Sequence, residues 1–231
     1  MSVKQLVPGL YVVAMGAVNA YVIDGGDSGL TLIDTGLEKS APKIEEAVHS
    51  IGRQPTDVRT ILLTHAHPDH LGSAARFATP EGTVALHPDD EEIARQGVIH
   101  QTMSPSPGLL NRIVFRLAIG YEPAEFPPVE PNRPLADGET LDIAGGLEVI
   151  HTPGHTPGHV SFLWKQDRGV LIAGDAAANL FGLGFAIGYE DLSVAKTSLA
   201  ALAQREFEMA VFGHGRPITS NASSKFARKF G

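Results

Sequence analysis

The chain has 231 residues, with 18 Lys and Arg against 26 Asp and Glu, a formal net charge of −8 and no cysteine. This composition predicts a globular protein with one domain over residues 1–231, and the lack of cysteine excludes disulfides, thiolate ligands and iron–sulfur clusters. The acidic balance without a Lys/Arg cluster argues against nucleic acid as a partner. No apolar run is long enough for a signal-peptide core or a membrane span, which predicts a cytoplasmic protein with no membrane partner.

The first half of the chain predicts an antiparallel meander of strands separated by Gly-rich turns, followed by alternating helices and strands. In chain order the predicted elements are strands at 10–14, 20–24 and 30–34, a helix at 38–51, a strand at 60–64, a helix at 71–77, a strand at 83–86 and an acidic helix at 88–96.

Residues 101–134 differ in character, with seven prolines around an apolar, basic middle, and are predicted to form a lid insertion. Strands then return, and the second half repeats the plan of the first. Its predicted elements are strands at 140–143, 147–152, 160–164 and 170–173, a helix at 192–204, a strand at 209–212 and a short helix or loose end after Ile218. Two halves of this kind indicate two packed sheets with helices outside.

Four potential metal ligands lie where the strand at 60–64 ends. They are His65, His67, Asp69 and His70, and Pro68 favours the start of a helix between them. The first two can point to one side of an extended loop, and the last two can face a second point from the first helical turn. Imidazole and carboxylate suit zinc, iron or manganese.

Three further residues follow apolar strands beside glycines, namely His155, Asp175 and His214. The set divides into two groups: His65, His67 and His155 for one ion, and Asp69, His70 and His214 for another, with Asp175 as a bridge. Two ions with open positions predict a catalytic site. His159 is expected to support this site from behind, whereas His151 is expected to pack or cap, and no role is assigned to His49, His87 or His100.

In this order of ligands the chain resembles the metallo-β-lactamase-fold hydrolases, over about residues 9–215. The resemblance implies an α+β fold, a four-layered αββα sandwich with a dinuclear site at one edge between the sheets. It also implies that the matched residues are the ligands, and that Asp34 accepts a hydrogen bond from a ligand imidazole and fixes its tautomer.

Several branches of this family fit to different degrees. Glyoxalase II and the acyl-homoserine lactone lactonases share all the ligand positions, but the lactonases carry a catalytic tyrosine where this chain has Ala178. β-Lactamases of this pattern lack the bridging Asp, which counts against antibiotic hydrolysis. Persulfide dioxygenases hold a single iron on positions matching His65, His155 and Asp175, so this chemistry is the alternative.

The sequence therefore predicts a metal-dependent hydrolase with two zinc ions, in which a hydroxide held between the ions attacks an ester, lactone or thioester carbonyl. Asp69 is expected both to bind metal and to take part in proton transfer. Apolar residues in the lid and at 180–187 predict a small-molecule substrate with an apolar part, or alternatively a subunit interface in a homodimer. Tyr121 and Tyr189 are the phenols expected near the cleft, and Arg112 and Arg116 share one helix face.

Overall fold

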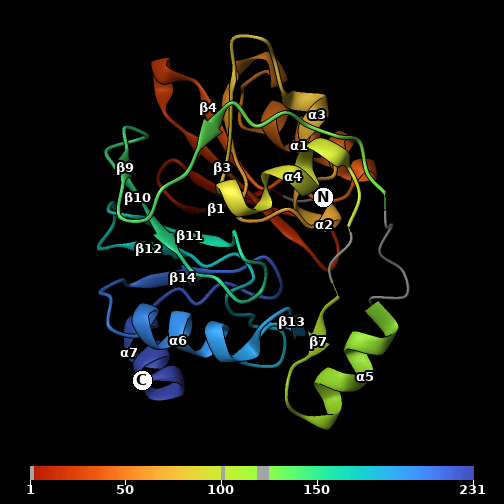
Figure 1. Cartoon of the computed structure of the whole chain (residues 1–231). Coiled ribbons are helices and arrows are strands. Elements are labelled where there is room, and N and C mark those ends of the chain that lie inside the picture. The colour runs from red at the N-terminus through yellow and green to blue at the C-terminus, as the bar shows by residue number, and fades with distance from the viewer. Residues whose placement is uncertain (1–2, 100–101, 119–124) are drawn as a thin grey trace.

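A computed structural model of the chain describes residues 3–99, 102–118 and 125–231 (Figure 1). Its strands are β1 Val3–Val7, β2 Leu10–Ala14, β3 Asn19–Asp24, β4 Leu30–Ile33, β5 Val58–Leu62, β6 Thr83–Leu86, β7 Ser104–Pro105, β8 Arg133–Pro134, β9 Thr140–Leu141, β10 Leu147–His151, β11 Val160–Trp164, β12 Val170–Ile172, β13 Gly188–Tyr189 and β14 Met209–Val211. Its α-helices are α1 Ala41–Ser50, α2 Pro68–Leu71, α3 Ala74–Phe77, α4 Pro88–Gln96, α5 Leu109–Ala118, α6 Leu192–Leu202 and α7 Ala222–Phe230. Short 3-10 turns lie at Gly26–Ser28, Glu38–Ser40 and Pro55–Asp57.

Two sheets form the centre of the molecule. The first has the order β1-β2-β3-β4-β5-β6-β8, antiparallel from β1 to β4 and parallel from β4 to β8. The second has the order β14-β12-β11-β10-β9, in which only β12 and β14 are parallel neighbours. A separate two-stranded ribbon joins β13 to β7.

Alternating side chains divide the apolar residues of each sheet between two cores. In β3, Tyr21 and Ile23 pack between the sheets with Phe162 and Ile172, while Val22 belongs to the cluster beneath the helices of the first half. Because successive strand residues point to opposite faces, this pattern buries both faces of each sheet.

Helices cover both outer faces, as Figure 1 shows, with α1 and α4 on the first sheet and α6 and α7 on the second. Ile44 and Ile93 pack against the first sheet, and Leu199 and Phe226 against the second. The predicted four-layered αββα sandwich is confirmed.

Most predicted elements are present, and the differences include an unpredicted strand and a divided helix. Strand β1 was not predicted, because Lys4 and Gln5 interrupt its apolar pattern on an exposed edge. The predicted helix at 71–77 was wrong at its start: α2 ends at Leu71 and α3 begins at Ala74. Gly72 lies at this break, so close to the backbone of Pro68 and of Glu38 that a side chain there would overlap them.

The segment predicted as a lid, residues 101–134, has two described parts with different surroundings. Helix α5 stands apart from the two-sheet body in Figure 1, beside β7 and β13, and its Leu109, Leu110 and Leu117 side chains are exposed. Further along, Phe126 is buried in the first core and β8 pairs with β6. None of the helices in the described residues is long and apolar enough to cross a membrane.

Candidate metal centre

The predicted ligands lie at one edge of the sandwich, where strands of both sheets end. The loop 63–67 follows β5, and Asp175 and His214 follow the parallel strands β12 and β14. Tyr21 in the first sheet ties this edge together, because its hydroxyl donates to the Phe212 carbonyl at 2.7 Å and accepts from the Phe212 N–H at 3.1 Å. The parallel strand ends therefore bring separate parts of the sequence to one place.

The structure brings all the predicted ligands into one cluster. Ligand atoms lie within 4.8 Å of one another in each of three groups, which are His65/His67/His155, His65/His70/Asp175 and Asp69/His70/His214. Carboxylate oxygens of Asp175 lie 3.7 Å from His70 Nε2, 3.5 Å from His155 Nε2 and 3.1 Å from His214 Nε2. Asp175 thus touches both halves of the cluster, as expected of a bridging ligand.

The three-histidine half is held neutral. His65 Nδ1 donates to the Thr64 hydroxyl at 2.9 Å and His155 Nδ1 donates to the Gly188 carbonyl at 2.9 Å, so each ring turns Nε2 inward. His67 Nδ1 lies 3.0 Å from His155 Nε2. Burial and neighbouring imidazoles lower the pKa of His67 to about 3, and burial also lowers the pKa values of His65 and His155. Neutral imidazoles are the form that binds a metal.

The half formed by Asp69, His70 and His214 favours protonated histidines. Burial opposes protonation of His70, but Asp69, Asp175 and Asp34 outweigh it and raise the pKa of His70 to about 9. Burial likewise opposes protonation of His214, and Asp175 and Asp69 raise its pKa well above the ordinary value. The pKa values of both Asp69 and Asp175 fall despite burial, because these two histidines lie beside them. Without a metal, protons would balance these carboxylates.

Three buried polar atoms in the cluster have no hydrogen-bond partner, and all three face the space between the ligands: His65 Nε2, His70 Nε2 and Asp175 Oδ1. Buried polar atoms are rarely left unpaired, since each costs about 1–3 kcal/mol. Divalent ions that accept nitrogen and oxygen ligands would satisfy all of them, so the residues present fit a metal pair.

The family model of the metallo-beta-lactamase superfamily matches residues 13–214. This chain belongs to the metallo-beta-lactamase superfamily. It is 34% identical to the uncharacterized protein YobT of Bacillus subtilis (strain 168) over 71% of this chain and 63% of that protein. It is also 26% identical to the probable metallo-hydrolase YflN of the same organism, over 91% of this chain and 85% of that protein.

Solved metallo-beta-lactamases share the fold. BJP-1, a subclass B3 enzyme of Bradyrhizobium japonicum, superposes with a TM-score of 0.70 at 24% identity, covering 93% of this chain and 78% of that one. A Cronobacter sakazakii enzyme reaches 0.72 at 24% identity, covering 93% and 81%. At this identity the likeness concerns the fold alone. The chain spans only 63%, 52%, 59% and 54% of four of its curated relatives. The family is therefore established, and the activity, reaction and substrate of the whole protein are matters for proposal.

In this superfamily member Asp34 holds the ligand loop from one side. Its carboxylate accepts from His70 Nδ1 at 2.8 Å, as the resemblance implied, and also from the Thr64 N–H and hydroxyl. Asp34 has a φ of 57°, in the left-handed region that costs an ordinary residue about 1 kcal/mol or more. A strained backbone at this position places a carboxylate directly behind the imidazole of His70, a predicted ligand.

Asp90, which the sequence analysis missed, holds the same loop from the other side. This fully buried carboxylate accepts from the N–H groups of Ala66 and Gly158, at 3.0 and 2.7 Å, and from the Thr156 hydroxyl at 2.7 Å. It thereby joins the two loops that carry His65 and His155. One signal was present: Asp90 lies at helical spacing from Ile93 and Ala94, on the buried face of α4.

His159 positions Asp175, in agreement with its expected supporting role. Its Nε2 accepts from the Asp175 N–H at 2.9 Å, which requires Nδ1 to donate to the Thr152 hydroxyl at 2.8 Å. Burial lowers the pKa of His159 well below its ordinary value, consistent with a neutral ring in this role.

The predicted phenols do not supply a proton donor within the described residues. The Tyr189 hydroxyl donates to the Ala176 carbonyl and accepts from the Ala186 N–H, and burial raises its pKa. Tyr121 lies outside the described residues, as does His100. Arg112 and Arg116 are exposed on α5.

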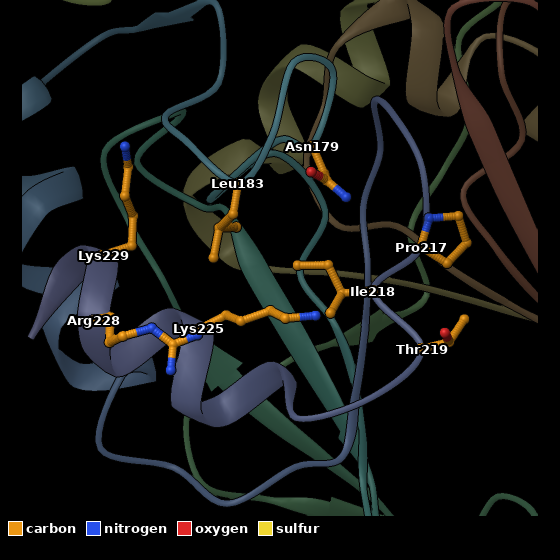
Figure 2. Close-up of a pocket in the computed structure, with 8 residues that line it drawn as sticks. All are labelled: Asn179, Leu183, Pro217, Ile218, Thr219, Lys225, Arg228 and Lys229. Carbon is orange, nitrogen blue, oxygen red and sulfur yellow. The ribbon is translucent and has the colours of Figure 1, made fainter.

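Another hollow lies near the cluster but contains none of its ligands. Figure 2 shows this cavity of about 510 Å³, with Lys225, Arg228 and Lys229 of α7 on one side and Asn179 and Leu183 facing them. Its basic lining contrasts with the carboxylates of the metal centre, so the two sites differ in the charge they favour.

Proposed function

We propose that this chain is a dinuclear zinc hydrolase that cleaves an ester, lactone or thioester with an apolar acyl part. The observation that supports it most is the cluster of predicted ligands in which His65 Nε2, His70 Nε2 and Asp175 Oδ1 are buried and unpaired. Two ions there would supply an activated water at neutral pH and would polarise a carbonyl oxygen.

The chain's own residues divide the remaining work. The neutral rings of His65, His67 and His155 would hold one ion, and Asp69, His70 and His214 the other, with Asp175 between them. Asp69 Oδ2 lies 3.3 Å from His214 Nε2, and the Asp69 side chain keeps 12% of its surface exposed, against 4% for Asp175. Asp69 is therefore the carboxylate best placed both to bind metal and to move a proton to or from a bound substrate.

An apolar cavity supports the choice of substrate class. It has a volume of about 290 Å³ and lies between Asn111 of α5 and the loop that follows Asp175. Ala178, Phe181 and Phe185 line it, and Phe181 is 73% exposed. Lys229 also lines this cavity, but its apolar residues begin three residues after Asp175 in the sequence and suit the acyl chain of a substrate.

The metal content of the purified protein is the first test, measured per chain by elemental mass spectrometry. At least two zinc ions are expected. The number should fall in His65→Ala and Asp69→Ala but not in His49→Ala, which changes an exposed histidine on α1. Ester, lactone and thioester hydrolysis should fall in the same two variants. Hydrolysis that survives both substitutions would refute the proposal, and a single iron with oxygen consumption on a persulfide would replace it with the dioxygenase.

Acyl preference tests the cavity separately. Each additional buried CH₂ contributes about 0.8 kcal/mol, so kcat/KM should rise about fourfold per CH₂ from acetyl to longer esters. Phe181→Ser should reduce this slope and leave the acetyl ester unaffected, while Val194→Ser, an exposed apolar residue on α6, serves as the control. Equal rates for short and long chains would remove the apolar part from the proposal.

A further inference from the structure

Two histidines that the metal centre does not use lie stacked at the back of the His155 loop. His87 follows β6 and caps α4, and His151 ends β10 in the other sheet. Their ring centroids are 4.1 Å apart with an interplanar angle of 8°. Together with Asp89 they present one ligand atom each within 4.8 Å of one another.

The two rings differ in how their nitrogen lone pairs are used. His151 Nε2 donates to the Pro157 carbonyl, 2.9 Å away, which leaves Nδ1 to carry the lone pair. His87 Nδ1 accepts the cap hydrogen bond of α4 from the Asp89 N–H at 3.3 Å and lies 3.7 Å from Asp89 Oδ2, so an ion bound at this nitrogen would replace the cap. Burial and the adjacent His151 lower the pKa of His87. Two imidazoles beside a carboxylate form a donor set of the kind that binds zinc.

The surroundings of this pair are acidic. A cavity of about 470 Å³ is lined by Asp89, His151, Glu190 and Asp191 but not by His87, and no Lys or Arg among the described residues lines it. Glu190 lines the cavity, and its Oε1 atom is buried without a hydrogen-bond partner. Asp137 adds a further carboxylate, which accepts from the His151 N–H at 2.8 Å. A cation entering the cavity meets negative charge from several elements and no positive charge.

We propose that His87, Asp89 and His151 form a third metal site, which binds one divalent transition-metal ion such as Zn²⁺. Closing both nitrogens on one ion requires the stacked rings to tilt toward each other at one edge. The Asp89 carboxylate can follow this movement, because its side chain is 57% exposed.

The position of the site gives it a structural consequence. Asp90, next to Asp89, holds the loop of His65 and His67, while His151 and Pro157 flank the loop of His155. An ion bound to Asp89 and His151 would therefore link the two loops that carry the three-histidine half of the metal centre. It would stabilise the folded chain by binding this form and not the unfolded one.

Zinc stoichiometry tests the site independently of catalysis. Wild-type protein is dialysed to equilibrium against micromolar Zn²⁺ and the bound zinc is counted per chain by elemental mass spectrometry. His87→Asn is the main variant, since asparagine retains the ability to cap α4, and His151→Ala is the second. His49→Ala is the matched control. Thermal unfolding and circular dichroism establish that each variant is folded.

The expected result is one zinc fewer in His87→Asn and in His151→Ala than in wild type and in His49→Ala. This difference does not depend on whether the main centre holds two ions, one or none, so failure of the hydrolase proposal leaves the test intact. Equal zinc in wild type and both variants overturns the third site. Equal loss in all three histidine variants also overturns it, because it shows adventitious binding to surface imidazoles.

Discussion

Replacing Asp90 should destabilise the fold more than any other single carboxylate change on α4. Asp90→Ala leaves the Ala66 and Gly158 N–H groups and the Thr156 hydroxyl without their acceptor. An unsatisfied buried donor costs about 1–3 kcal/mol. The hydroxyl can turn to another acceptor, and removing the carboxylate recovers its burial cost, which raises the pKa of Asp90 in the folded chain. The two backbone donors then give a net loss of about 3 kcal/mol.

Urea unfolding of the metal-free protein measures this loss. The single tryptophan, Trp164, is 3% exposed between the two sheets, so its fluorescence reports loss of the core. With an m value of about 2 kcal/mol/M, the midpoint should fall by about 1.5 M. Asp90→Asn keeps one acceptor oxygen and should lose roughly half as much. Glu92→Ala, an exposed change on the same helix, should cost less than about 0.5 kcal/mol.

The reasoning would be refuted if Asp90→Ala shifted the midpoint no more than Glu92→Ala does. If Asp90→Asn and Asp90→Ala shifted the midpoint equally, the loss of stability would come from the lost charge and not from the unpaired donors.

Three further predictions concern the metal centre. In metal-free protein the pKa of His70 is raised from about 6.5 in the unfolded chain to about 9 in the folded chain. Its protonation therefore contributes about 3 kcal/mol to the free energy of unfolding, which is complete below pH 6.5 and is lost as the pH rises through 9. The urea midpoint should be higher at pH 6 than at pH 9.5, and an unchanged midpoint would contradict this reasoning. Asp34→Asn should weaken zinc binding about 10–100-fold, because it removes the charge behind His70. Asparagine tolerates the left-handed backbone of this position. Competition with a chelator measures the affinity, and an unaltered affinity would exclude this role. Gly213→Ala should abolish zinc binding at the Asp69/His70/His214 half, because a Cβ there would overlap Asp175 Oδ1 and lie 2.5 Å from His70 Cε1. Gly184→Ala is the control and should retain zinc, because a Cβ there has no neighbour nearer than 3.9 Å. Full zinc content in Gly213→Ala would contradict the packing argument.

The layers and the candidate ligands could both be predicted because their signals are local in the sequence. Alternating apolar residues in β3 and helical spacing in α1 are local signals, and the layers follow from them. The ligands were found because His65, His67, Asp69 and His70 lie within six residues. Their assignment as ligands remains a prediction, to which the structure adds that these side chains meet His155, Asp175 and His214.

What the sequence could not predict depends on contacts between separate elements. Asp90 stands in an acidic run with Asp89, Glu91 and Glu92, and nothing local marks it as the buried member except its spacing from Ile93. His87 was given no role because its partner, His151, lies 64 residues away on the other sheet. Such pairs are defined by the packing of the two halves, which no short pattern records.

The geometry of the predicted metal centre therefore depends on residues outside the predicted ligand set. The loop of His65 to His70 is short and its histidines could turn in many ways, yet Asp34 fixes Thr64 and His70 from one sheet and Asp90 fixes Ala66 from a helix. His159 does the same for the backbone of Asp175. Each of these groups is buried and uses its hydrogen-bonding capacity on the ligand loops, so its desolvation cost is offset by contacts that orient a ligand. A ligand motif transplanted without these supports would keep its residues and lose its geometry, because the distances among the ligands follow from the clamped backbone and not from the motif.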